Sequence, residues 1–199
     1  IVTDDALARD AVRALVERDP ARALIVSAAT FNAIATLPAG VGVLAVVPTP
    51  VPRTSAFGGF CMLLDGVQDP GNVGAIVRAA DAAGATGGCV AGASADPLGW
   101  KALRGSMGSA LRLPGVRSAA VVSSCADLAA LGLELLATTQ DAPASVYDCD
   151  LARPVAILLG SEGQGLPSAA LAAASGRVAI PMRAGVESLN VAVAAALVA

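Results

Sequence analysis

The feature that most constrains this chain is an alternation, between residues 60 and 199, of short continuous apolar runs with segments of helical spacing. Strands of a parallel sheet read as continuous apolar runs, because helices cover both faces of such a sheet. We expect strands at residues 60–64, 88–91, 119–122, 134–138, 154–159 and 177–180, separated by helices at residues 72–83, 101–111, 126–131, 167–174 and 189–199. The alternation predicts an α/β fold, a parallel sheet with helices on both faces.

A second, smaller domain is expected before this region. Residues 3–18 have the spacing of an amphipathic helix, and residues 23–28 and 41–47 are short apolar strand candidates. Three prolines then fall within residues 48–52, and this run indicates a linker because proline cannot donate to a sheet ladder. The expected domains are therefore a small α/β domain at residues 1–48, a proline-rich linker at 49–59 and a larger domain at 60–199.

The absence of histidine limits the chemistry that this chain can perform. Without a histidine base, the usual Ser-His-Asp triad is excluded. The four cysteines contain no C-x-x-C pair, so we expect buried free thiols and no bound metal. The net charge of −3 is not the basic signature of a nucleic-acid-binding protein, although binding depends on local patches rather than on the total.

No segment of the sequence is expected to enter a membrane. The longest apolar run, residues 191–199, is far shorter than the roughly 20 residues that span a bilayer. Asp4 and Asp5 are acidic, and no basic region followed by an apolar stretch is present, so no signal peptide is expected. We expect a cytoplasmic protein without a membrane partner. The last run has no helix cap, which indicates a sequence that continues beyond residue 199.

Three glycine-bearing segments each follow an expected strand, at the edge where open α/β sheets bind ligands. The first, residues 64–80, contains an Asp-Pro-Gly-Asn turn that puts Asn72 at the start of a helix. Arg78 follows six residues later among apolar neighbours, which predicts a half-buried cation. Taken alone, that arginine could equally be a structural residue paired with a carboxylate.

The other two segments also have structural alternatives when each is taken alone. Residues 157–166 carry three glycines in a G-x-x-G-x-G spacing, with Glu162 among them, and could simply form a turn. This spacing is neither the dinucleotide motif nor the P-loop, which disfavours a Rossmann-type dehydrogenase. Residues 180–194 place Ser188 and Asn190 just before a helix, where either residue alone would be a cap.

Together and in this order, the three segments resemble the three signature motifs of the SpoU/TrmH family of RNA ribose 2′-O-methyltransferases, in the SPOUT superfamily. The matching residues are Asp69, Pro70, Asn72, Gly74, Arg78 and Ala80 in the first motif, Gly160, Glu162, Gly165 and Leu166 in the second, and Ile180, Pro181, Met182, Ser188, Leu189, Asn190, Val191 and Ala194 in the third. Residues 104–114 resemble a further conserved stretch of the family. The resemblance covers residues 60–199.

The resemblance implies a parallel sheet whose C-terminal part forms a deep trefoil knot. The knot loops, residues 160–166 and 180–190, would bind S-adenosylmethionine in a bent form, without a metal. The implied cofactor-binding residues are Gly160, Glu162, Ile180, Met182, Leu189 and Ala194. Family members are homodimers, and their RNA sites lie close to the dimer interface.

The resemblance also implies which residues carry out the reaction. The implied catalytic residues are Arg78, Asn72, Ser188, Asn190 and Glu162. Because arginine stays protonated, we expect Arg78 to hold phosphate and the 2′-hydroxyl rather than to act as a neutral base. Asn72 and Asn190 would orient the ribose, Ser188 would hold Arg78 or the substrate, and Glu162 would complete the set near the cofactor.

The expected function is methylation of a ribose 2′-hydroxyl, most simply of a guanosine in 23S rRNA. The first domain resembles the small α/β RNA-binding domain of many rRNA-modifying members, although it is shortened at its start, and this favours rRNA over tRNA as the partner. DNA is not an expected partner. The alternatives are a tRNA 2′-O-methyltransferase, an antibiotic-resistance methyltransferase and a catalytically inactive knotted RNA-binding protein.

Overall fold

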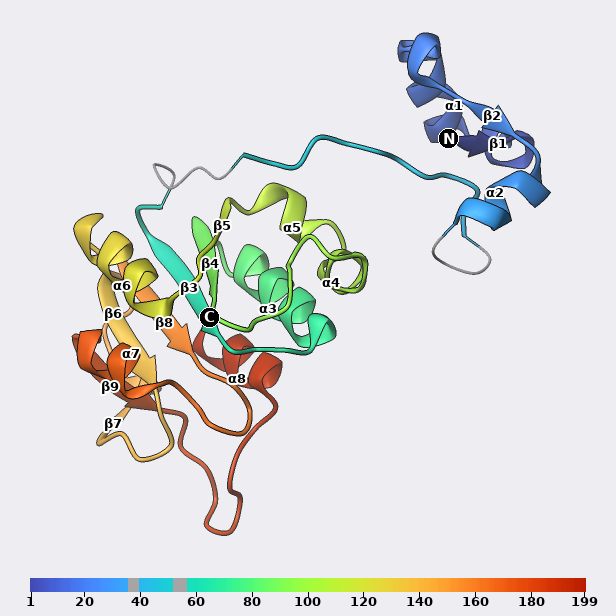
Figure 1. Cartoon of the computed structure of the whole chain (residues 1–199). Coiled ribbons are helices and arrows are strands. Elements are labelled where there is room, and N and C mark those ends of the chain that lie inside the picture. The colour runs from blue at the N-terminus through green and yellow to red at the C-terminus, as the bar shows by residue number, and fades with distance from the viewer. Residues whose placement is uncertain (36–39, 52–56) are drawn as a thin grey trace. The chain divides into compact units, whose positions relative to one another are not determined.

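The computed structural model describes residues 1–35, 40–51 and 57–199, in two compact units, Ile1–Thr49 and Pro50–Ala199 (Figure 1). Residues 52–56 of the expected linker lie outside the described residues. Each unit has its own secondary structure and is described separately.

The first unit contains a two-stranded parallel sheet, β1 (Val2–Thr3) and β2 (Ile25–Val26). Its helices are the 3-10 helices η1 (Asp4–Ala8) and η2 (Pro20–Arg22) and the α-helices α1 (Asp10–Arg18) and α2 (Ala28–Ile34). Ser27 caps α2, because its hydroxyl oxygen accepts a hydrogen bond from the backbone nitrogen of Thr30 at 3.2 Å. Phe31 of this helix is buried and anchors it to the unit.

Two predictions for this unit are wrong in detail. The single helix expected over residues 3–18 is divided at Arg9, whose extended backbone separates η1 from α1. The strand expected over residues 41–47 is reduced to one antiparallel bridge between Val43 and Val2, next to Gly42 with its left-handed φ of 70°. The run pairs with the free edge of β1, and that strand is only two residues long, so no longer ladder can form.

The second unit is built on a seven-stranded parallel sheet with the strand order β5-β4-β3-β8-β6-β9-β7. The strands are β3 (Phe60–Asp65), β4 (Gly87–Ala91), β5 (Gly115–Arg117), β6 (Glu134–Thr138), β7 (Ala144–Ser145), β8 (Val155–Leu159) and β9 (Gly176–Ala179). The helices are α3 (Pro70–Ala82), α4 (Trp100–Ser106), α5 (Ser109–Arg112), α6 (Val121–Ala130), α7 (Ser168–Ala173) and α8 (Val191–Val198), with the 3-10 helix η4 (Val146–Asp148). The parallel α/β sheet predicted from the apolar runs is confirmed.

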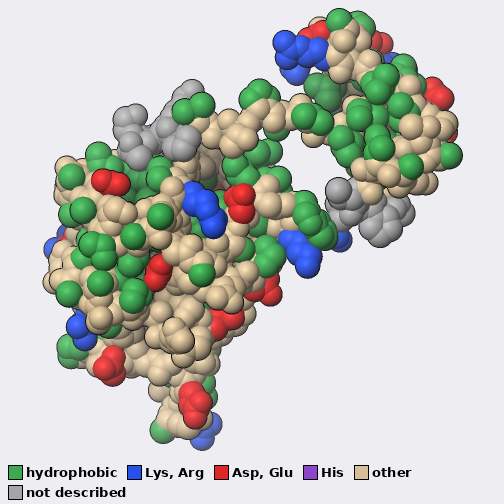
Figure 2. Space-filling view, viewed as in Figure 1, with side chains coloured by type: hydrophobic (Ala, Val, Ile, Leu, Met, Phe, Trp, Pro, Cys, Tyr) green, Lys and Arg blue, Asp and Glu red, His purple; other side chains and the backbone are tan. Residues whose placement is uncertain are grey.

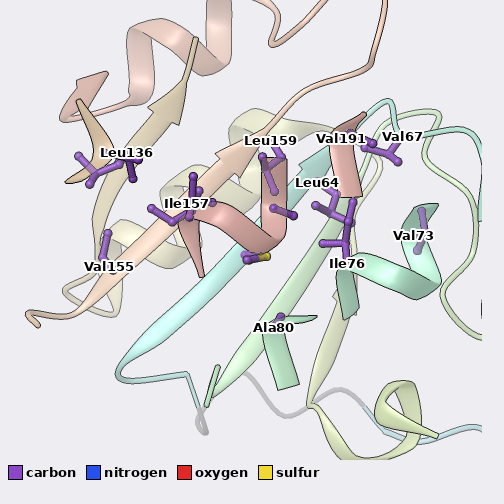
Figure 3. Packing of buried hydrophobic residues seen from close by; sticks show 14 of the residues in the cluster. Leu64, Val67, Val73, Ile76, Ala80, Leu136, Val155, Ile157, Leu159 and Val191 are labelled. Carbon is purple, nitrogen blue, oxygen red and sulfur yellow. The ribbon is translucent and has the colours of Figure 1, made fainter. Parts of the chain in front are cut away.

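Alternate side chains of each central strand enter two separate apolar layers. In β3, Cys61 and Leu63 join the layer that holds residues of α6 and α7, whereas Met62 and Leu64 join the layer under α3 and α8. Figure 3 shows the second layer, in which residues from these two helices meet side chains of β3 and β8. This period of two follows from the pleat of the strands, and it lets helices cover both faces.

The prediction of a strand at residues 119–122 is wrong. The strand lies earlier, at β5, and pairs with β4, while Val121 begins helix α6. Val121, Cys125 and Leu128 are buried at helical spacing against the sheet, so packing favours the helix over a strand for this run.

The helix predicted at residues 101–111 is two helices. Met107 ends α4 in the left-handed conformation (φ 50°), and Gly108 follows with a φ of 90° before α5 begins. A non-glycine residue rarely adopts this conformation, which is why helical spacing alone did not predict the break.

Helices α3 and α4 pack closely because glycines line their contact. A Cβ on Gly74 would lie 2.5 Å from the carbonyl oxygen of Ala102, and a Cβ on Gly105 would lie 3.4 Å from that of Gly71. Close packing at this crossing therefore ties α4 to the first half of α3. None of the helices in the described part of the chain is long and apolar enough to cross a membrane.

Candidate active site

The candidate site lies at the carboxyl edge of the sheet, where the loops after neighbouring strands β3, β8, β6 and β9 meet. The loop after β3 leads into α3, and Asp69 caps that helix. Its Oδ1 accepts hydrogen bonds from the backbone nitrogens of Gly71 at 2.6 Å and Asn72 at 3.4 Å, and Pro70 occupies the first helical position. The Asp-Pro-Gly-Asn turn thereby fixes Asn72 at the helix start.

Asn190 serves the helix and the site at once. Its Oδ1 caps α8 by accepting hydrogen bonds from the backbone nitrogens of Ala192 at 2.9 Å and Val193 at 3.3 Å. The Nδ2 of the same amide donates to Asn72 Oδ1 at 3.3 Å and to Glu162 Oε1 at 3.4 Å. The capping interpretation of Asn190 is therefore correct, and it accounts for only half of the side chain.

Glu162 completes a cluster of one residue from each of the three glycine-bearing segments. Its Oε1 accepts a hydrogen bond from Asn72 Nδ2 at 2.5 Å, in addition to the bond from Asn190. We call Asn72, Glu162 and Asn190 the polar cluster. Sequence separations of 90 and 118 residues from Asn72 mean that only the fold brings these groups together.

The loop after β8 is a tight turn that needs glycine at its base. Ser161 and Gly165 exchange two backbone hydrogen bonds, of 3.2 and 2.9 Å, and Gly165 has a φ of 67°. A Cβ on Gly160 would lie 2.1 Å from the carbonyl carbon of Gly165 and 2.3 Å from the backbone nitrogen of Leu166. No side chain fits at position 160 without opening the turn.

A pocket of about 580 Å³ opens between these loops. All six residues that the resemblance assigned to cofactor binding line it, namely Gly160, Glu162, Ile180, Met182, Leu189 and Ala194. Backbone groups of the turn and apolar side chains form the wall, and Glu162 places the polar cluster at the pocket. A pocket of this size and lining suits a small organic molecule with one polar end.

The loop after β6 also lines this pocket, and our reasoning from the sequence missed it. Thr138, Thr139 and Gln140 contribute, and Thr139 Oγ1 is buried without a hydrogen-bond partner among the described residues. The available signal was positional, because these residues follow a correctly predicted strand at the same carboxyl edge.

Arg78 and Ser188 stand apart from the polar cluster. Arg78 is exposed rather than half-buried, because Ile76 and Ala80 take the buried positions of α3. Six residues along a helix give a rise of about 9 Å and a different face, so Arg78 cannot point in the same direction as Asn72. Across the described ranges, neither Arg78 nor Ser188 makes a side-chain hydrogen bond, and Arg78 has no ion pair. Ser188 is exposed and lines the pocket.

None of the four cysteines lines this pocket. All four are free thiols, of which Cys61, Cys89 and Cys125 are buried as expected and Cys149 is half-buried. Burial raises the pKa of Cys89 to about 12, with a smaller contribution from nearby Cys61. That thiol therefore stays protonated at neutral pH. No group of three or more Asp, Glu or Cys residues within the described ranges could hold a metal ion.

Comparison with known proteins gives consistent matches. The model of the SpoU rRNA Methylase family matches residues 59–199. The chain is 40% identical over 133 residues to an uncharacterized tRNA/rRNA methyltransferase from Synechocystis sp., covering 67% of this chain and 48% of the relative. It is 36% identical over 136 residues to the 23S rRNA (guanosine(2553)-2′-O)-methyltransferase RlmP from Bacillus subtilis, covering 68% and 54%. The chain thus spans about half the length of these curated relatives.

A solved structure that is similar to this chain is the SpoU methyltransferase AviRb from Streptomyces viridochromogenes. It has a TM-score of 0.86 and 30% identity, covering 96% of this chain and 76% of AviRb. Its complex with the cofactor AdoMet has a TM-score of 0.68 and 34% identity, covering 75% and 60%. The similarity extends over both units of the chain.

Proposed function

The chain belongs to the SpoU rRNA methylase family, and from this premise we propose that it is an S-adenosylmethionine-dependent methyltransferase that modifies a ribose 2′-hydroxyl of RNA. The resemblance inferred from the three motifs is thereby confirmed. The observation that carries the proposal is the polar cluster, because Asn72, Glu162 and Asn190 come from the three separate motifs and meet beside one pocket.

The pocket supports S-adenosylmethionine as the methyl donor. The tight turn at Gly160 exposes backbone groups to a ligand, and Ile180, Leu189 and Ala194 provide apolar wall. AviRb, which shares this fold, has been solved with AdoMet bound. The donor supplies a methyl group on a sulfonium, which is already a good leaving group, so the chain needs no metal to activate it.

The residues of the chain then hold the ribose and ease the loss of its proton. Methyl transfer forms a bond from the 2′-oxygen to the methyl carbon and breaks the bond from that carbon to sulfur, while the 2′-proton leaves to solvent. The amides of Asn72 and Asn190 would orient the ribose, and Glu162 fixes both amides. Arg78 would hold a phosphate and the 2′-hydroxyl, which stabilises the developing negative charge. Ser188 would contact Arg78 or the substrate.

A guanosine in 23S rRNA is the proposed substrate, acted on in the cytoplasm. RlmP, named for that reaction, supports it. The alternative substrate is tRNA, since the Synechocystis relative is named for both RNAs. A catalytically inactive RNA-binding protein is disfavoured, because RNA binding alone would not require the polar cluster to lie beside a pocket for a small molecule.

Two finer features belong to the same proposal. The loops at residues 160–166 and 180–190 would pass through one another as a trefoil knot, as the family resemblance implies. The first unit, Ile1–Thr49, would be the substrate-binding domain for RNA, joined by the proline-rich linker. The match to AviRb covers 96% of this chain and therefore includes most of this unit.

We expect the protein to be a homodimer, because helix α8 also has apolar side chains on its exposed side. Val191, Ala195 and Val198 are buried, yet Val193 and Leu197 on the same helix remain exposed. An exposed apolar strip on a helix of the site suits a self-complementary interface. Light scattering should give the mass of two chains. A monomer that still methylates RNA would contradict a site shared between two copies.

The function is tested by incubating the protein with methyl-labelled S-adenosylmethionine and undermodified total RNA, followed by separation of rRNA from tRNA. Label on a 2′-oxygen of large-subunit rRNA is the expected result. Label in tRNA alone would retain the chemistry and reject the rRNA assignment. RNA binding without any label would favour the inactive RNA-binding alternative.

A further inference from the structure

Helix α4 displays an aromatic side chain with a cation over it, outside the pocket and the polar cluster. Trp100 begins the helix and is 50% exposed, and it is the single tryptophan of the chain. Lys101 Nζ lies 5.5 Å from the centroid of the Trp100 ring. Burial of a tryptophan ring is strongly favourable, so an exposed one has apolar surface that a partner can cover. About half of Trp100 remains open in this way.

We propose that Trp100, with Lys101 and Arg104, is a stacking platform for an unpaired base of the RNA substrate near the methylated nucleotide. The inference rests on the proposed function and adds a contact that the polar cluster and the pocket do not supply. Proteins that bind single-stranded nucleic acid combine aromatic side chains, on which bases stack, with cations that attract the backbone.

The charges around Trp100 complement a phosphate backbone. Arg104 lies one turn along α4 from Trp100 and is exposed, so its side chain shares that side of the helix. The nearby carboxylate of Asp96 accepts a hydrogen bond from the backbone nitrogen of Leu98 at 2.9 Å and so closes the turn before α4. Figure 2 shows Lys or Arg side chains beside hydrophobic ones over the part of the molecule where α4 lies.

Arg112 on α5 makes a useful contrast. Its guanidinium binds Asp81 Oδ2 at 2.6 Å, so its charge is already paired within the fold. Lys101 and Arg104 have no ion pair among the residues that the structure describes. Two unpaired cations beside an exposed indole, in a chain of net charge −3, mark a local basic site rather than a general basic surface.

The platform is held in a fixed relation to the candidate site. The glycine contacts between α3 and α4 place Gly105 against Gly71, the residue before Asn72. Ala102 and Ser106 are buried on the inner side of α4, which leaves Trp100 on the outer side. A base stacked on Trp100 would therefore help to set where the ribose arrives relative to Asn72.

The experiment uses the intrinsic fluorescence of Trp100, which is the only tryptophan signal of the chain. The probe is a ten-nucleotide single-stranded RNA with a terminal fluorescein, so that anisotropy reports binding independently of the tryptophan. We expect tryptophan emission to be quenched along the same binding curve, because the base stacks on the ring. Binding by anisotropy with unchanged tryptophan emission would overturn the platform.

Variants separate stacking from charge. Trp100→Ala should weaken RNA binding about 5- to 150-fold, the range for loss of one stacked base, whereas Trp100→Phe should retain most of it. Lys101→Ala and Arg104→Ala should each lower the slope of log affinity against log salt by about 0.7. The matched control is Arg153→Ala. This change removes an exposed cation that pairs with Glu134 at the amino ends of β6 and β8, and it should leave RNA binding unchanged.

The readouts also distinguish the two proposals. If the protein transfers methyl groups and its Trp100→Ala variant has an unchanged KM for RNA, the platform is wrong and the proposed function stands. Quenching and weakened binding without methyl transfer would keep the platform and reject the enzyme. If a protein partner rather than RNA occupied α4, RNA would neither quench the tryptophan nor depend on it, and the proposal would be wrong.

Discussion

Gly160→Ala is expected to weaken binding of S-adenosylmethionine severely, while Gly163→Ala, in the same turn, should leave the affinity within about twofold. The added Cβ at position 160 would lie 2.1 Å from the carbonyl carbon of Gly165 and 2.3 Å from the backbone nitrogen of Leu166. Both neighbours are backbone, so the turn must open to relieve the clash. We expect the affinity to fall at least about 100-fold, equivalent to about 2.7 kcal/mol.

Gly163 is a matched control because a Cβ there would meet nothing within 4 Å and its φ is not left-handed. Titration calorimetry with S-adenosylmethionine measures both variants, and the Tm of each without ligand reports any loss of fold. If Gly160→Ala remained folded and bound the donor as well as the Gly163→Ala variant, the turn would not be part of the cofactor site.

The central sheet could be predicted because each of its strands is a continuous apolar run in the sequence. Residues of β3, β6 and β8 are buried on both faces, so each reads as a continuous apolar run in any context. The prediction for β6, residues 134–138, matches the structure residue for residue.

The wrong predictions concern short apolar runs whose residues fit either a strand or another backbone conformation. Residues 119–122 are apolar enough for a strand, yet their burial follows α6, since Val121 and Cys125 face the same layer four residues apart. The run at residues 41–47 meets only β1, a strand of two residues, so it forms a single bridge. In both cases the deciding contact is made by residues distant in sequence, which periodicity does not report.

The candidate site divides in the same way. Asn72, Glu162 and Asn190 could be identified because each stands in a motif with a distinctive spacing. Their mutual hydrogen bonds depend on the order of strands in the sheet, which only the fold supplies. Thr139 belongs to no such motif, so its position beside the pocket became evident only from the structure.

Arg78→Ala is expected to lower the rate of methyl transfer about 100- to 1,000-fold, which is the range for removing one group that stabilises developing negative charge. Arg78 does not line the pocket, so the affinity for S-adenosylmethionine should stay within about threefold. The expected loss therefore lies in kcat, with RNA affinity reduced by one phosphate contact.

Single-turnover kinetics with labelled donor separate these effects. Arg78→Lys keeps the charge but loses the planar fork that holds two oxygens together, so we expect it to recover RNA affinity and only part of the rate. Arg153→Ala is the control, since that guanidinium pairs with Glu134 away from the site.

Full activity in Arg78→Ala would remove this residue from the mechanism and leave the polar cluster alone to orient the ribose. A loss of donor binding equal to the loss of rate would instead make Arg78 a residue that shapes the pocket. A reduced rate with an unchanged affinity for the donor is therefore the result that assigns Arg78 to the 2′-oxygen and the phosphate beside it.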